Sequence, residues 1–225
     1  MPAFQTADDV LRRARWTVQP DQGSRTLGRL LACILAFAFL YGGVMGSFRG
    51  LAGLPGWEQQ VLYSAIKAPL LLTGSFLITL PTFFVLCTLL GLRDDFAAAV
   101  RALFTAQAGL AITLASLAPL TLLCYASTIS HSQSLAFNGL MFAIASLAGQ
   151  ALLRSHYRPL IARNPRHRQM LLAWGVVYVF VAIQLAWLLR PFIGSRGLEV
   201  QFFRDDAWGN AYVVVAKLVW KVLFG

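Results

Sequence analysis

Long apolar stretches alternate with short polar segments along this chain, and the clearest stretch runs without a charged residue from Ala68 to Leu92. Lys67 precedes this stretch and Arg93 follows it. A helix of about 20 apolar residues is long enough to cross the hydrocarbon core of a bilayer. Because the same pattern recurs, we predict an all-α, polytopic transmembrane bundle with five spans, at residues 30–48, 68–92, 103–125, 135–153 and 170–189.

Residues 1–28, before the first span, are polar and basic. Thr6, Asp8 and Asp9 are typical of a helix start, because a hydroxyl group and carboxylates accept hydrogen bonds from the first backbone amides. Apolar residues then recur at helical spacing, which predicts a short amphipathic helix on the membrane surface. A loosely ordered tail is the alternative.

Residues 191–225, after the last span, form a mixed loop and then a predicted amphipathic helix over 207–224. Its polar side chains share one narrow stripe, made of Asp206, Asn210, Lys217 and Lys221. This stripe favours a helix that lies in the membrane interface, and a short sixth span with lysines reaching the headgroups is the alternative. The chain therefore divides into an N-terminal segment (1–28), a five-span membrane domain (29–190) and a C-terminal region (191–225).

The composition supports a membrane protein, since 58% of the residues are hydrophobic and only 12% are charged. Soluble domains carry about twice that share of charged residues. The net charge of +10 would suggest nucleic-acid binding in a soluble protein, but the positive-inside rule explains it here, so no nucleic-acid partner is expected. Three cysteines lie singly in apolar stretches, which argues against a disulfide framework and a zinc site.

The distribution of basic residues predicts the orientation of the spans. Only Arg49 and Lys67 fall in the loops that would face outward if the N-terminus is cytoplasmic, whereas most arginines fall on the opposite side. Cytoplasmic loops carry the excess of lysine and arginine in multi-pass proteins. We therefore predict a multi-pass protein of the cell membrane (inner or plasma membrane) with its N-terminus in the cytoplasm.

The first span carries small residues at every fourth position in its second half: Ala38, Gly42, Gly46 and Gly50. Residues four apart lie on one face of a helix, and the absence of side chains there lets a second helix approach closely. We predict a helix-packing face. Its partner is either another span of this chain, which we favour, or a second copy of the protein.

Pro81 and Pro119 interrupt the second and third predicted spans. An interior proline removes a backbone hydrogen bond and kinks a helix. We predict that the two kinked helices form an antiparallel hairpin at the centre of the bundle. Paired kinks pack statically, form a hinge or line a cavity.

Gln107 and Gln150 lie near the inner ends of their spans and are predicted to meet. They would form either a hydrogen bond that holds the bundle together or a polar pocket. The segment between the fourth and fifth spans is the most basic loop, and His156 and His167 in it are expected to face solvent. Its arginines either contact anionic lipid headgroups or only set the topology; they are Arg154, Arg158, Arg163, Arg166 and Arg168.

The sequence shows no motif of a known catalytic or cofactor site. No P-loop, GxSxG, HExxH or GxGxxG pattern is present, and the five predicted spans contain no Asp, Glu, His or Lys. Asp94 and Asp95 are adjacent in sequence, which suits helix capping better than a shared catalytic role. We therefore expect a protein that is not an enzyme and that holds no metal or cofactor.

The five spans, the cytoplasmic N-terminal segment, the small-residue-rich helices and the absence of intramembrane charge together resemble the Yip1-type family of multi-pass membrane proteins. The segments KAPLLLTGSFLITLPTFF and LLRPFIG are also similar to those of bacterial membrane proteins of this general type. The resemblance implies a scaffold or adaptor that acts through helix–helix contacts rather than an enzyme. We expect it to bind lipids or other membrane proteins, or to self-associate. The alternative is a transporter or channel for a small solute or lipid, with its path at Pro81 and Pro119.

Overall fold

The computed structural model describes residues 2–12, 14, 23–127, 130–194, 199–204 and 213, and the described part is helical without strands. Five of its helices are long and apolar enough to cross a membrane, which confirms the predicted helical bundle. The helix predicted over 207–224 lies outside the described residues apart from Val213. The elements are α1 (Pro2–Leu11), α3 (Gly23–Gly46), α4 (Phe48–Leu51), α5 (Trp57–Leu89), η2 (Arg93–Asp95), α6 (Phe96–Ser116), α7 (Ala118–Ser127), α8 (His131–Arg163) and α9 (Arg166–Leu189).

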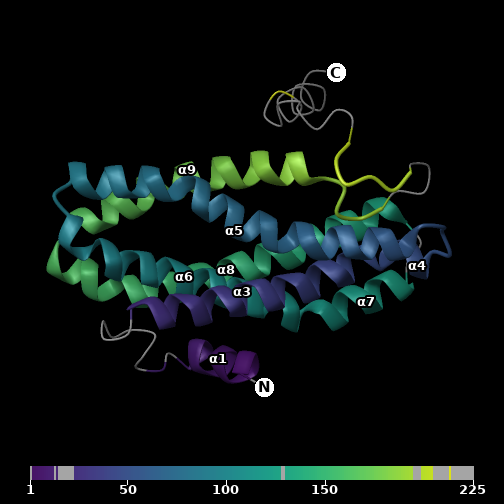
Figure 1. Ribbon diagram of the computed structural model, residues 1–225, viewed down its shortest axis with the longest axis horizontal. Helices are drawn as coiled ribbons and strands as arrows, with labels where there is room; N and C mark the ends of the chain where they lie inside the picture. Colours follow the sequence, from purple (N-terminus) through teal and green to yellow (C-terminus); the bar gives the residue numbers. More distant parts are fainter. Residues whose placement is uncertain are drawn as a thin grey trace.

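Helix α3 is central to the packing, because it lies along both α5 and α6. Figure 1 shows α9 along one edge of the bundle and α1 along the opposite edge. Helix α9 packs mainly on α5, and α8 packs mainly on α6. Only 6% of the most apolar 18-residue segment of α9 is buried. The corresponding fraction is 44% in the span that contains α3. The last span is therefore peripheral and presents most of its surface to the surroundings.

The close contact between α3 and α5 depends on two glycines. A Cβ atom added at Gly42 would overlap the carbonyl oxygen of Ser64, and one added at Gly46 would lie 2.6 Å from the Cα of Val61. A Cβ at Gly50 would lie 3.2 Å from the ring of Trp57. Ala38, one turn before Gly42, is completely buried in the core that α3 shares with α1 and α6. The helix that lies against Gly42 and Gly46 belongs to this chain.

Helix α5 is longer than the predicted second span. It begins at Trp57, directly after Gly56 with its φ of 72°, and continues for 33 residues through Pro69 and Pro81. The segment from Trp57 to Lys67, which precedes the predicted second span, is therefore the first third of one continuous helix. The predicted boundary was wrong because Lys67 interrupts the apolar pattern without interrupting the helix.

The predicted hairpin of two kinked helices is not formed. Helices α5 and α6 have few mutual contacts, whereas α3 contacts both. Pro81 lies about 12 Å along its helix from Leu89, while Pro119 lies about 35 Å along the next span from Phe96, at the usual helical rise. Both prolines are exposed. Pro119 stands in the first turn of α7, after a break at Leu117, where the missing amide costs no hydrogen bond.

The segment predicted as a basic loop is helical. Helix α8 continues through Pro159 to Arg163, and α9 begins at Arg166, so only Asn164 and Pro165 form the turn. The side chain of Asn164 accepts a hydrogen bond of 3.1 Å from the amide of Arg166 and so caps the start of α9. At 33 residues, α8 is about 50 Å long, well beyond the hydrocarbon thickness of about 30 Å. The five arginines are exposed on these helical extensions: Arg154, Arg158, Arg163, Arg166 and Arg168.

Candidate functional site

A buried polar cluster lies where α5 meets the segment that follows α9. Gln60, Ser64 and Lys67 stand on successive turns of α5, and their exposed fractions are 1%, 0% and 0%. We name them the Lys67 cluster, and we call this end of the bundle the Lys67 end. This cluster is not predicted from the sequence, because Lys67 borders the apolar stretch, which is also the position of a lysine that marks the membrane boundary.

The Lys67 cluster binds backbone carbonyl groups. The Nζ of Lys67 donates to the carbonyl oxygen of Pro191 at 3.0 Å, and the Oγ of Ser64 donates to that of Phe192 at 2.5 Å. The Nε2 of Gln60 donates to the same Phe192 oxygen at 3.2 Å. These carbonyl groups directly follow the last turn of α9, where the negative end of the helix dipole favours a cation. The cluster thus fastens the segment after α9 to α5.

The charge of Lys67 is stabilised by aromatic rings rather than by a carboxylate. Its Nζ lies 4.9 Å from the ring centre of Phe202 and 6.0 Å from that of Tyr63, within cation–π range. Within the described residues, no carboxylate forms an ion pair with Lys67. The part of α5 beyond Lys67 is about 33 Å long, so a membrane-spanning α5 would place Lys67 at one edge of the hydrocarbon core.

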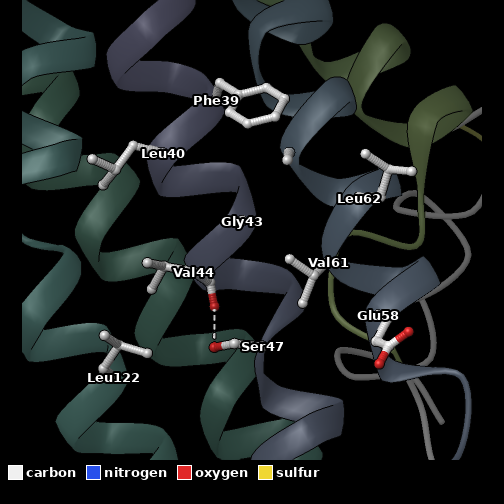
Figure 2. Close-up of a pocket in the computed structure, with 10 residues that line it drawn as sticks. Phe39, Leu40, Gly43, Val44, Ser47, Glu58, Val61, Leu62 and Leu122 are labelled. Carbon is white, nitrogen blue, oxygen red and sulfur yellow. Dashed lines mark hydrogen bonds between the residues drawn. The ribbon is translucent and has the colours of Figure 1, made fainter.

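A groove of about 440 Å³ runs between α3, α5 and α7 on the other side of the α3–α5 contact. Its walls carry Phe39 and Leu40 from α3, Leu62 from α5 and Leu122 from α7, all of which are exposed. Figure 2 shows these side chains with Phe39 at one end of the row and Ser47 and Glu58 at the other. We call this feature the α3–α5–α7 groove.

The floor and the polar end of the groove differ in chemistry from its walls. Gly43 and Ala65 line it without bulk, and a Cβ at Gly43 would lie 3.9 Å from the Cβ of Ala65, in ordinary contact. The Oγ of Ser47 donates to the carbonyl oxygen of Val44 at 2.7 Å (Figure 2). Glu58, in the first turn of α5, is the charged residue of the lining.

The opposite end of the bundle, which we call the Asp95 end, holds a buried histidine. The Nε2 of His167 lies 3.0 Å from Oδ2 of Asp95, and His167 is completely buried. Arg163 lies 3.9 Å from the same carboxylate and is exposed. His156 is buried as well, so the expectation that both histidines face solvent was wrong. Asp95 stands at the start of α6, as predicted for a cap, but its side chain bonds His167 and not the helix amides.

The predicted meeting of Gln107 and Gln150 does not occur. Gln107 is buried and its Nε2 donates to the hydroxyl of Tyr178 on α9 at 2.5 Å and to the carbonyl oxygen of Leu72 at 3.4 Å. Gln150 is exposed on α8. Helix α8 is rotated so that Gly149 faces α6 and its neighbour Gln150 faces away from α6. The polar contact of Gln107 therefore joins α6 to α5 and α9.

Among the described residues, no group of three metal-ligating side chains is assembled. No protein-family model, curated protein or solved structure matches this chain. The resemblance to Yip1-type proteins therefore stays a prediction.

Proposed function

We propose that this chain is a non-enzymatic multi-pass membrane protein that binds phospholipid, with one acyl chain in the α3–α5–α7 groove. The groove itself carries the proposal. Its walls are alkyl and aromatic, and its volume of about 440 Å³ is within the usual range for a small-molecule site. Its large apolar wall residues Phe39, Leu40, Leu62 and Leu122 are exposed. Within a bilayer, the acyl chain of a lipid fills an apolar groove at the lowest cost in free energy.

The positions of the glycines favour lipid over a partner helix. The face of Gly42 and Gly46 is not open to another protein, because α5 of this chain occupies it, as the favoured prediction had it. Between Phe39 and Ser47 the groove is about 12 Å long, little more than the diameter of one helix. Helix association in membranes needs close backbone approach along a small-residue face, whereas the groove has only Gly43 and Ala65 as small apolar lining residues, between bulky neighbours.

The basic residues support an outward-facing groove. The Asp95 end carries the exposed arginines of α8 and α9, whereas the groove lies toward the Lys67 end. With the N-terminus in the cytoplasm, as the positive-inside rule predicts, the groove opens at the level of the outer leaflet. The same arginines would contact anionic headgroups of the inner leaflet.

The transporter alternative draws no support from the positions of its key residues. Pro81 and Pro119 are exposed and lie at different levels, so they do not line a common cavity. Gln107 and Gln150 do not form a shared pocket.

Filling the groove tests the proposal. In Gly43→Leu, the new side chain enters the groove from an ordinary Cβ position, and the loss of about two methylene contacts lowers lipid affinity about tenfold. Gly139→Leu is the matched control, because nothing lies within 4 Å of a Cβ there. Native mass spectrometry of the delipidated protein, titrated with phospholipid, measures the tightest lipid adduct. Equal adducts in the wild type and both variants would contradict the proposal.

A further inference from the structure

Resting on the proposed function, we infer that the α3–α5–α7 groove selects a phospholipid whose headgroup carries an ammonium group, phosphatidylethanolamine being the type. The inference concerns the polar end of the groove, where Ser47, directly after α3, and Glu58 of α5 belong to the lining (Figure 2). An amphiphile with its chain in the groove brings its headgroup to this end. The chemistry there decides which headgroup is stabilised.

The polar end offers hydrogen-bond acceptors and negative charge. Glu58 is exposed, and its carboxylate has no ion-pair or hydrogen-bond partner among the described residues. The hydroxyl proton of Ser47 is already donated to Val44, so this side chain can only accept from a ligand. An ammonium group supplies donors and a positive charge, and it therefore complements both side chains.

Two basic residues near the groove donate hydrogen bonds to backbone carbonyl groups. Lys67 is completely buried and donates to Pro191 on the other side of the α3–α5 contact. Arg49 is buried, and its Nε donates to the carbonyl oxygen of Pro55 at 2.6 Å. A headgroup without an ammonium, such as that of phosphatidylglycerol, would bring a net negative charge to Glu58 and find no cation among the described residues of the groove lining.

A competing role for Glu58 is to stabilise the first turn of α5, because a carboxylate at a helix start interacts with the unpaired amides. That role would affect thermal stability and leave lipid preference unchanged. Glu58→Gln removes the charge at nearly constant shape, and Glu58→Asp restores it. Glu199→Gln is the matched control, since Glu199 is also exposed and lies outside the groove lining.

The experiment is native mass spectrometry of the delipidated full-length protein with equimolar phosphatidylethanolamine and phosphatidylglycerol of identical chains. For wild type, Glu58→Asp and Glu199→Gln we expect a preference for phosphatidylethanolamine of about fivefold, the scale of one partly solvated ion pair. Glu58→Gln should bind both lipids equally, and Glu58→Lys should prefer phosphatidylglycerol.

The outcomes separate the two proposals. Wild-type binding that is lost in Gly43→Leu but shows no headgroup preference overturns the ammonium inference and leaves the groove as a lipid site. A preference that persists in Glu58→Gln also overturns the inference, because it would place selectivity elsewhere. Adducts that are insensitive to Gly43→Leu overturn the proposed function and the inference together.

Discussion

The two ends of the helical bundle each bury one basic side chain completely, but different groups hold it. Lys67 contacts a backbone carbonyl oxygen and two aromatic rings, whereas His167 contacts the carboxylate of Asp95. A lysine without a carboxylate partner depends on the backbone that surrounds it, because a buried charge must be solvated by something. The Lys67 end is therefore held by main-chain geometry, and the Asp95 end by a side-chain pair.

The packing around the two residues differs in the same way. At the Lys67 end, Gly42 and Gly46 let the backbones of α3 and α5 meet. At the Asp95 end, large rings fill the space between α5 and α9, with the centroids of Phe83 and Trp174 5.5 Å apart in an edge-on contact. Two backbones in contact leave no room for an added atom, whereas side chains in contact can rotate to make room. We therefore expect the Lys67 end to tolerate substitution less well than the Asp95 end.

The largest effect should come from Gly46→Leu. Its Cβ would lie 2.6 Å from the Cα of Val61 and 2.8 Å from the carbonyl oxygen of Gln60, and neither can move without separating α3 from α5. We expect a destabilisation of at least about 3 kcal/mol and loss of monodisperse protein in size-exclusion chromatography. Gly139→Leu on α8 should behave as wild type. A stable, monodisperse Gly46→Leu variant would show that the close α3–α5 contact is not required for the stability of the fold.

A smaller effect is expected from Lys67→Met, which keeps the volume and removes the donor. The carbonyl oxygen of Pro191 then retains only the 3.5 Å contact from Gln60, at a cost of about 2 kcal/mol, partly offset because a buried charge is also removed. Hydrogen exchange should increase in residues 190–194. If exchange there stays at the wild-type level, Lys67 does not fasten this segment.

The smallest of the three effects should come from Asp95→Ala, which leaves the buried ring of His167 without its carboxylate. We expect a cost of about 1 to 2 kcal/mol and faster hydrogen exchange at the start of α9. Asp94→Ala is the control, because Asp94 is the exposed neighbour. Equal exchange in the two variants would remove the distinction between an end held by a side-chain pair and an end held by backbone contacts.

The helical bundle and its candidate spans could be predicted from the sequence, because a long apolar stretch indicates a helix that is surrounded by lipid. It could not separate a boundary lysine from a buried one, since Lys67 has the same neighbours in sequence in either case. Whether Lys67 is covered depends on Pro191 and Phe202, more than 120 residues later in the chain. Contacts between residues so far apart in the chain produce no periodic pattern in the sequence.

The errors around proline and glutamine have a similar origin. Pro81 and Pro119 were paired because their helices are consecutive, but consecutive helices need not pack, and α3 takes the position that the hairpin required. The prediction that Gln107 meets Gln150 depends only on their similar depth in the membrane. Helix α8 is rotated so that Gln150 faces outward. The groove was not predicted at all, because its lining comes from three helices and its residues are ordinary in each of them.

The most direct test of the account is to map where lipid contacts the protein in a bilayer. A phospholipid with a photoreactive acyl chain, reconstituted with the wild-type protein, would be crosslinked and the labelled peptides quantified. The lining from α3 and α5 lies within residues 39–47 and 58–65, and the exposed face of α9 around Leu172, Val176 and Val179 is an internal control outside this groove. We predict labelling concentrated in the groove and lost in Gly43→Leu. Labelling spread evenly over the groove and α9 would contradict a lipid site.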